Sequence, residues 1–307
     1  MSHLSVVVPV YNESTLIEEL VKRIKLNLKL ITEDFEIIVV DDGSQDKTWE
    51  LIETEAMNEE RIKGLRFSRN FGHHYAITAG LLNSNGEWVV VMDGDLQDRP
   101  EVIPELYKKA QEGFDVVFVS RQNRPESFLY KSLQKLFYLS LNFISGLKLN
   151  SKEANFSIIN RKVVKEFNKF PDQYRFYGST IKWLGFKRTS INAVHGKRFS
   201  GKPSYTVRKR VNLAIDILTS FSERPLRISI YIGVIFSVLS LIFFIASGYI
   251  FLFTEIRLNE IVFFANLIIF LSGILLTVIG ISSIYIGKIF NETKKRSLFI
   301  ISDKLNW

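Results

Sequence analysis

The stretch Val89-Val-Val-Met-Asp-Gly-Asp-Leu-Gln-Asp98 governs how the rest of this sequence is interpreted. Its β-branched start predicts a buried strand, which stops at two carboxylates, Asp93 and Asp95, separated by Gly94. In open α/β sheets, ligands bind beyond the carboxyl ends of the strands, and a glycine there allows close approach. Two carboxylates this close repel each other unless a cation lies between them. We therefore expect Mg²⁺ or Mn²⁺ here, shared with substrate phosphates, although a polar turn would also explain the pattern.

Other apolar runs of strand length surround this stretch, and patterns with helical spacing separate them. We predict strands at residues 4–10, 35–40, 62–67, 89–92 and 116–120, and helices at 18–31, 47–56, 75–83 and 100–112. This alternation predicts an α/β fold with a doubly wound, mostly parallel sheet. A dinucleotide-binding domain would carry Gly-x-Gly-x-x-Gly after its first strand. That position holds Pro9-Val-Tyr-Asn-Glu13, which excludes a nicotinamide or flavin enzyme.

The composition indicates a membrane protein. The chain has 307 residues, a net charge of +8 and no cysteine, which excludes disulfides and thiolate metal sites. A basic balance suits either nucleic acid or an anionic membrane surface. Two uncharged runs, at 228–253 and 261–287, each exceed the ~20 residues that span a bilayer core. We predict a C-terminal hairpin of two transmembrane helices, and no nucleic-acid partner.

The charges that flank this hairpin predict its orientation. Residues 197–227 hold eight Lys or Arg against two acids, and residues 288–307 hold five against two. The positive-inside rule therefore places both ends in the cytoplasm of a multi-pass plasma (inner) membrane protein. We expect a cytoplasmic catalytic domain at 1–225, the transmembrane helices within 226–290, and a basic cytoplasmic tail at 291–307.

Two further segments are candidates for helices at the membrane surface. Residues 128–146 have apolar side chains at helical spacing with lysines on the other side, and this segment could be a core helix or could lie in the membrane interface. We favour the interface, and we expect a similar amphipathic helix near residues 207–222.

Four motifs together resemble those of family 2 glycosyltransferases of the GT-A fold. They are Val-Pro-Val-Tyr-Asn-Glu (8–13), Val-Asp-Asp-Gly-Ser (40–44), Ser-Arg-Asn-Phe-Gly-His (68–73) and Met-Asp-Gly-Asp-Leu-Gln-Asp (92–98). The nearer resemblance is to the polyprenyl-phosphate branch, which includes dolichol-phosphate mannose synthase and bactoprenol glucosyltransferases. It extends over nearly the whole chain, including Arg-Phe-Ser-Gly-Lys-Pro-Ser-Tyr at 198–205.

The resemblance implies an inverting, membrane-anchored glycosyltransferase. Its donor would be a nucleotide-sugar, with UDP favoured over GDP by analogy with bacterial members. Its acceptor would be polyprenyl phosphate, undecaprenyl phosphate in a bacterium, and its product would serve surface-glycan or lipid modification. Relatives assemble through their membrane segments, which implies a homo-oligomer.

The resemblance also implies roles for individual residues. The residues expected to bind the nucleotide-sugar are Pro9, Tyr11, Glu13, Asp41, Asp42, Arg69, Asp93 and Gln97. Those expected at the cation are Asp93, Asp95 and Gln97, and those expected to act in catalysis are Asp93, Asp95 and Arg121. Those expected to bind the lipid phosphate are Arg121, Arg124, Lys131, Arg198 and Lys202. Helix capping or turn formation is the alternative for Glu13 and Asp42, and a solvated basic face is the alternative for the lipid-phosphate set.

One departure from the family pattern concerns the catalytic base. Some relatives carry an acidic residue before the Phe of an Asp-Phe-Arg-Leu stretch, where this chain has Asn155-Phe-Ser-Ile158. An asparagine cannot take a proton. A phosphate monoester has a second pKa near ~6, so the acceptor is largely dianionic and already nucleophilic. Either Asp95 shares the role of base or no base is used. For His73 and His74 we expect packing or surface roles.

Two other functions remain as alternatives. A processive polysaccharide synthase would carry Gln-x-x-Arg-Trp and more membrane helices, and Gln173-Tyr-Arg-Phe-Tyr177 does not fit that motif. A non-catalytic membrane scaffold with a degenerate transferase domain is the second alternative. The intact Asp-Gly-Asp-Leu-Gln stretch argues against it.

Overall fold

The computed structural model describes residues 3–122, residues 153–194 except 171, 173 and 174, isolated positions between 226 and 245, and residues 260–307. The chain divides into two compact units. The first, which we call the sheet unit, comprises Met1–Ser140, Leu147–Val207 and Arg296–Trp307, and the second comprises Leu141–Gly146 and Arg208–Lys295. The expected interfacial helices near 128–146 and 207–222 lie outside the described residues, as does most of the first expected transmembrane span, 228–253.

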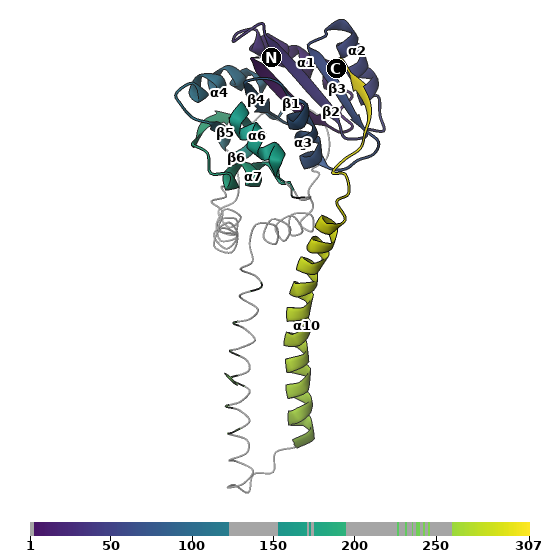
Figure 1. Ribbon diagram of the computed structural model, residues 1–307, viewed down its shortest axis with the longest axis vertical. Coiled ribbons are helices and arrows are strands. Elements are labelled where there is room, and N and C mark those ends of the chain that lie inside the picture. The colour runs from purple at the N-terminus through teal and green to yellow at the C-terminus, as the bar shows by residue number, and fades with distance from the viewer. Residues whose placement is uncertain are drawn as a thin grey trace. The chain divides into compact units, whose positions relative to one another are not determined.

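Within the described residues, the sheet unit is built on one sheet of eight strands in the order β7-β5-β6-β4-β1-β2-β3-β8 (Figure 1). The strands are β1 (Leu4–Val10), β2 (Phe35–Asp41), β3 (Ile62–Phe67), β4 (Trp88–Val91), β5 (Val116–Gln122), β6 (Glu153–Asn160), β7 (Arg188–Val194) and β8 (Ile301–Leu305). Strands β1 to β4 run parallel, whereas β6 and β8 run antiparallel to their neighbours. The mostly parallel α/β fold predicted from the sequence is therefore confirmed.

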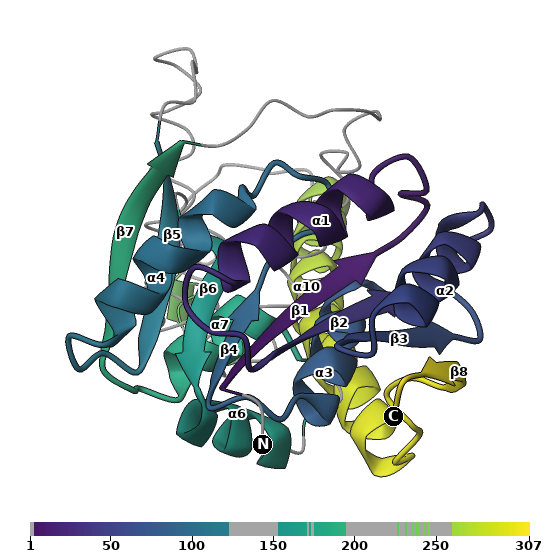
Figure 2. The ribbon, with the colours of Figure 1, turned by 90° about the horizontal axis from the view of Figure 1, so that it is seen from above.

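Helices cover both faces of this sheet (Figure 2). They are α1 (Ile17–Leu28), α2 (Thr48–Asn58), α3 (His73–Asn83), the 3₁₀ turn η1 (Pro100–Val102), α4 (Ile103–Ala110), α6 (Arg161–Lys169) and α7 (Tyr177–Trp183). Alternate residues of β1 point to opposite faces. Val6 belongs to the core cluster that includes α1, α2 and α4, whereas Val7 belongs to the cluster that includes α3, α6 and α7. Because β1 is buried on both sides, its sequence is continuously apolar rather than alternating.

The segment 291–307, expected from the sequence to be a basic cytoplasmic tail, contains a strand. Residues Ile301–Leu305 form β8, which pairs with the edge strand β3. The ring of Phe299 stacks on Phe67 at 4.9 Å, and the carbonyl of Ile300 accepts a hydrogen bond of 3.0 Å from the N–H of Ser68. This segment therefore covers a strand edge that would otherwise expose unpaired backbone groups.

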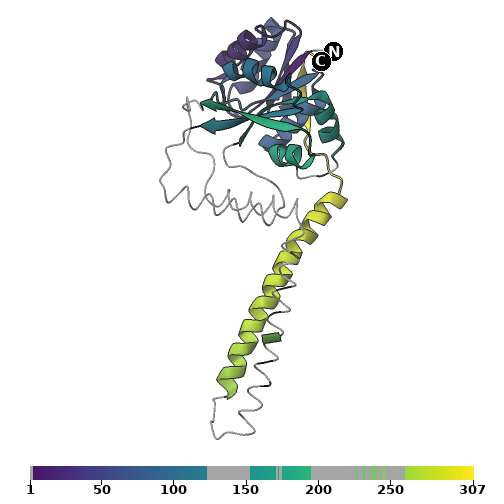
Figure 3. The same cartoon turned by 90° about the vertical axis from the view of Figure 1, so that its left-hand side faces the viewer.

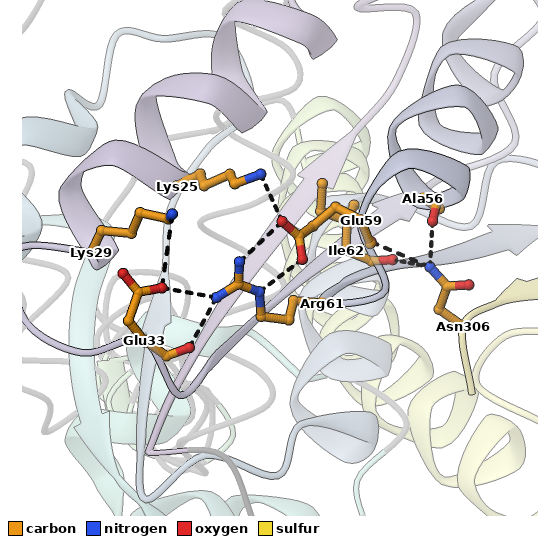
Figure 4. Close-up of polar contacts among 8 residues, drawn as sticks. All are labelled: Lys25, Lys29, Glu33, Ala56, Glu59, Arg61, Ile62 and Asn306. Carbon is orange, nitrogen blue, oxygen red and sulfur yellow. Dashed lines mark hydrogen bonds and ion pairs between the residues drawn. The ribbon is translucent and has the colours of Figure 1, made fainter.

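Asn306, directly after β8, bonds to residues on both sides of the turn between α2 and β3 (Figure 4). Its amide Nδ2 donates to the carbonyls of Ala56 and Ile62 at 2.7 and 2.8 Å. In the same turn, Glu59 pairs with Arg61 and Lys25, and these partners hold the pKa of Glu59 at about 2. Residues from α1, from this turn and from the C-terminal segment thus meet in one polar network.

Helix α10 (Glu260–Thr293) belongs to the second unit and runs for 34 residues without a break (Figure 3). Within it, Leu271–Thr293 has a mean hydropathy of 1.8, and none of its most apolar window is buried in the protein. Among the described residues this is the one helix long and apolar enough to cross a membrane. It overlaps the second expected span, 261–287.

We predict that Asn306→Ala lowers the stability of the sheet unit by about 1 kcal/mol, because two backbone carbonyls lose a donor. For a unit of this size that corresponds to a melting temperature lower by roughly 2–4 °C, measured by thermal unfolding of the full chain in detergent. Asp303→Ala, at an exposed position of β8, should have a smaller effect. Equal effects of the two substitutions would contradict a stabilising role for the hydrogen bonds of Asn306.

Candidate active site

The strand order reverses between β1 and β4. From β1 the chain proceeds outward to β2 and β3, and it then returns to the other side of β1 as β4. In open α/β sheets such a switch point is where ligands bind, beyond the carboxyl ends of the strands. The ends of these four strands and the loops that follow them carry nine of the residues predicted from the sequence: Pro9, Tyr11, Glu13, Asp41, Asp42, Arg69, Asp93, Asp95 and Gln97.

The loop after β4 holds its carboxylates through its own backbone. Oδ1 of Asp95 accepts the N–H of Gln97 at 3.0 Å, and Oδ2 of Asp98 accepts the N–H of Asp93 at 3.4 Å. Leu96 has a φ of +57°, which is rare for a residue with a side chain, and that side chain is only 2 % exposed. Burial of Leu96 in the core therefore keeps this tight turn in place.

Gly94 brings this loop against the end of β1. A Cβ at Gly94 would lie 2.6 Å from Cγ1 of Val10 and 3.1 Å from the carbonyl oxygen of Pro9. From the sequence we expected the missing side chain to make room for a ligand. In the structure the room is taken by β1, so the glycine sets the distance between the loop after β4 and the loop after β1.

Asp41, at the end of β2, carries a buried carboxylate that is only partly satisfied. Its Oδ1 accepts the N–H of Ser44 at 2.9 Å. Its Oδ2 lies 3.7 Å from Nε of Arg66 and has no hydrogen-bond partner among the described residues. Burial raises the pKa of Asp41, and the bond from Ser44 opposes this shift. A ligand with a hydrogen-bond donor would offset the desolvation cost of a buried oxygen that has no such bond.

Asp42 has a different role from its neighbour. Its Oδ1 accepts the N–H of Phe71 at 2.7 Å, and its Oδ2 accepts the N–H of Gly72 at 3.0 Å. Burial raises the pKa of Asp42, while these two N–H groups act in the opposite direction. This geometry favours the turn-forming alternative for Asp42 and leaves Asp41 as the candidate for contact with a nucleotide.

His73, the first residue of α3, lies in the site, although from the sequence we expected packing or a surface position. Its Nε2 is 3.2 Å from Oδ1 of Asp93 and 3.4 Å from Nδ2 of Asn155. Burial alone would lower the pKa of His73, but the carboxylates of Asp93, Asp42 and Asp98 together outweigh burial, and the pKa is raised. His74, in contrast, packs against Phe176, and burial lowers its pKa to about 3.

The remaining predicted residues are placed only in part. The ring of Tyr11 is 41 % exposed at the rim of the site. The guanidinium of Arg69 lies 4.0 Å over the ring of Phe71 and donates to the carbonyl of Asn70. Arg121 is in β5, paired with Ala193 of β7, and its side chain is outside the description. So are four whole residues of the expected lipid-phosphate set: Arg124, Lys131, Arg198 and Lys202.

The donor set fits a cation that is shared with a substrate. Asp93 and Asp95 are both partly exposed and lie on one short loop. The described residues contain no group of three or more His, Cys, Asp or Glu that could hold a metal alone. One or two carboxylates completed by phosphate oxygens and water is the usual environment of Mg²⁺ in nucleotide-dependent enzymes.

Comparison with known proteins identifies the family. Residues 5–167 match the family described as Glycosyl transferase family 2. The chain belongs to this family. It is 35 % identical over 301 residues to an uncharacterized glycosyltransferase of Bacillus subtilis, with 97 % of this chain and 92 % of the relative covered. It is 33 % identical over 305 residues to the bactoprenol glucosyl transferase of Shigella phage SfV, with 98 % of each chain covered. The predicted family and its enzymatic class, glycosyltransferase, are thus confirmed.

Solved structures confirm the GT-A fold. One is the glucosyl-3-phosphoglycerate synthase of Mycobacterium tuberculosis in complex with Mn²⁺, uridine diphosphate and phosphoglyceric acid. It aligns with this chain with a TM-score of 0.51 at 20 % sequence identity, and the alignment covers 73 % of this chain and 78 % of the synthase chain. A mannosyltransferase of Pyrobaculum calidifontis, in complex with GDP-Man and Mn²⁺, aligns with a TM-score of 0.50 at 19 % identity, covering 70 % and 62 %.

We predict that Gly94→Ala destabilises the sheet unit by about 1–3 kcal/mol, because the new methyl group overlaps Val10. In a Val10→Ala background the same substitution should cost less, since the overlapping Cγ1 is gone. A double-mutant cycle followed by thermal unfolding measures this coupling. Gly273→Ala in α10, where a Cβ would meet no described atom within 4 Å, serves as the control. Additive costs of the Gly94 and Val10 substitutions would contradict the contact.

Proposed function

We propose that this family 2 glycosyltransferase moves a sugar from a nucleoside diphosphate sugar, with UDP favoured, to a polyprenyl phosphate. The observation that carries the proposal is the pair of carboxylates, Asp93 and Asp95, held beside the end of β1 at the switch point of the sheet. The acceptor is inferred from relatives named bactoprenol glucosyl transferase, which match this chain over nearly its full length.

The acidic loop after β4 supports this proposal. Asp93 and Asp95, with Gln97, would hold Mg²⁺ or Mn²⁺ on the diphosphate of the donor, and the two solved neighbours named above contain Mn²⁺. The bound cation would supply charge stabilisation to the leaving nucleoside diphosphate. The contribution of this chain would be to hold both carboxylates on a turn that is constrained on two sides, because Leu96 is buried and Gly94 abuts β1.

The loops after β1 and β2 would bind the nucleotide. The unpartnered Oδ2 of Asp41 suits a donor of the base or ribose, and the exposed ring of Tyr11 suits contact with the base. Pro9, Glu13 and Arg69 complete the proposed donor-binding set. Asp42 supports this site through the backbone of the β3–α3 loop instead of through contact with the nucleotide.

The acceptor would arrive from a membrane. Helix α10 has the length and composition of a membrane span, and Arg121, Arg124, Lys131, Arg198 and Lys202 are the residues proposed to bind the lipid phosphate. In the proposed chemistry, an oxygen of this phosphate attacks the anomeric carbon in line as the bond to the nucleoside diphosphate breaks, which inverts the configuration. Asn155 can position groups but cannot act as a base, in keeping with an acceptor that is already anionic.

The domain arrangement follows from the same reasoning. We propose a cytoplasmic transferase domain within 1–225 and two membrane helices within 226–290, in a plasma membrane protein with both ends in the cytoplasm. After α10, the segment that contains β8 belongs to the sheet unit. Assembly into a homo-oligomer stays a prediction.

We predict that purified protein in detergent with Mn²⁺ transfers labelled sugar from one member of a panel of UDP- and GDP-sugars to undecaprenyl phosphate. Asp95→Asn should reduce this transfer by roughly 10²–10³-fold, because a charge that acts on the transition state is lost. EDTA should abolish the transfer and Mn²⁺ should restore it. Asp34→Asn, at an exposed position, is the matched control and should retain activity.

Other outcomes of this assay discriminate between the alternatives. Label in a long polymer would indicate a processive synthase. If no donor is used and no cation-dependent nucleotide binding is found, a non-catalytic scaffold is the better description. Transfer that survives in Asp95→Asn would remove this residue from the proposed cation site.

We further predict that Asp41→Asn weakens UDP binding by roughly 10–100-fold, because a charged acceptor is lost.

The Asp41→Asn variant should also change the pH dependence of stability. The folded-state pKa of Asp41 is raised above its ordinary value of 3.8. The stability that its protonated form contributes is therefore present below pH 3.8 and lost as the pH rises through the higher folded-state pKa. Thermal unfolding of Asp41→Asn should not show this loss of stability between pH 3.8 and the folded-state pKa. Identical pH dependence of stability in the wild type and the variant would contradict a raised pKa for Asp41.

A further inference from the structure

The contact between His73 and Asp93 joins the start of α3 to the loop after β4. Nε2 of His73 lies 3.2 Å from Oδ1 of Asp93, and that oxygen is buried. Both the imidazolium and the neutral tautomer with its proton on Nε2 donate from this atom, so the contact does not require a particular charge on the ring. We infer that His73 is a positioning residue that fixes the carboxylate of Asp93 for cation binding; this inference rests on the proposed function of Asp93.

The backbone holds His73 in place from its N-terminal side. Asp42 accepts the N–H groups of Phe71 and Gly72, the two residues before His73. Gly72 has a φ of +119°, a conformation that a residue with a side chain rarely adopts, and its carbonyl accepts the N–H of Tyr75 at 2.9 Å. These backbone hydrogen bonds fix the first turn of α3, from which the ring of His73 extends to Asp93.

Asn155 lies beside the same ring nitrogen of His73. Nδ2 of Asn155 in β6 lies 3.4 Å from Nε2 of His73, and a Cβ at Gly178 would lie 3.3 Å from Oδ1 of Asn155. Nε2 of the imidazole therefore faces both the carboxylate of Asp93, in the loop after β4, and the amide of Asn155, in β6.

A carboxylate that is held through one oxygen has fewer orientations to lose when a cation binds to the other. Hydrogen-bond partners of metal ligands typically contribute about 10–100-fold to metal affinity. We expect this chain to follow that rule, with His73 acting on the affinity for the cation rather than on the chemical step.

The test compares His73→Ala and His73→Gln, since the terminal amide of glutamine can donate from about the position of Nε2. The matched control is His3→Ala. His3 also faces a carboxylate, with Nδ1 3.5 Å from Glu87, but it precedes β1 at the opposite edge of the sheet. Mn²⁺ binding to full-length protein in detergent with saturating UDP is titrated by electron paramagnetic resonance of free Mn²⁺, which requires no turnover.

We expect His73→Ala to weaken Mn²⁺ binding by about 10-fold or more, His73→Gln to recover most of the affinity, and His3→Ala to match the wild type. In transfer assays, His73→Ala should raise the Mn²⁺ concentration needed for half-maximal rate, while kcat at saturating Mn²⁺ is largely kept. Thermal unfolding of His73→Ala should show a folded protein.

Unchanged or tighter Mn²⁺ binding by His73→Ala would overturn the inference, and so would a loss of kcat that excess Mn²⁺ does not restore. Asp93→Asn separates this failure from a failure of the proposed function. If Asp93→Asn loses Mn²⁺ and His73→Ala does not, the cation site stands without the positioning role. If neither the wild type nor any variant binds Mn²⁺ with UDP, the proposed cation site itself is wrong.

Discussion

The carboxylate of Asp42 is the constraint on which the rest of the site depends. It is almost fully buried and bonded to the backbone N–H groups of Phe71 and Gly72. Through these bonds Asp42 fixes the loop after β3, and that loop places His73 beside Asp93. A buried carboxylate is costly unless its oxygens are bonded. Here the cost is met by backbone donors that would otherwise lie unpaired in a loop.

The loops at the carboxyl edge of the sheet are tied to one another as well as to their strands. The backbone N–H of Asn12, after β1, donates to Ser44 after β2, and a side chain at Gly43 would overlap the backbone of Arg69 after β3. Gly94, after β4, abuts β1. Each pair of these loops on neighbouring strands therefore has a close contact. Groups held in this way need little reorganisation when charge develops on a substrate, which is the arrangement that favours catalysis by preorganised electrostatics.

The sequence predicted the parts of this molecule that local pattern determines. The bounds of β1 and β3 agree with expectation, because each is a short β-rich run that ends at polar turn residues. β6, β7 and β8 were missed, since their pairing is decided by distant strands and their sequences mix polar and apolar residues. The role of Asp42 was open, because adjacent aspartates look alike until their partners are known. His73 was dismissed, although it ended a recognised motif, because nothing local shows that α3 begins beside Asp93.

The position of β8 in the chain has a consequence for biosynthesis. A ribosome makes roughly 5–20 residues per second from the N-terminus, so β3 exists long before β8. Throughout the synthesis of α10, the outer edge of β3 has no partner from this segment. An open strand edge is a template for pairing with other chains. Pairing of β3 with β8 is therefore a late event that follows production of the apolar helix, and a chain that stops within α10 leaves this strand edge without β8.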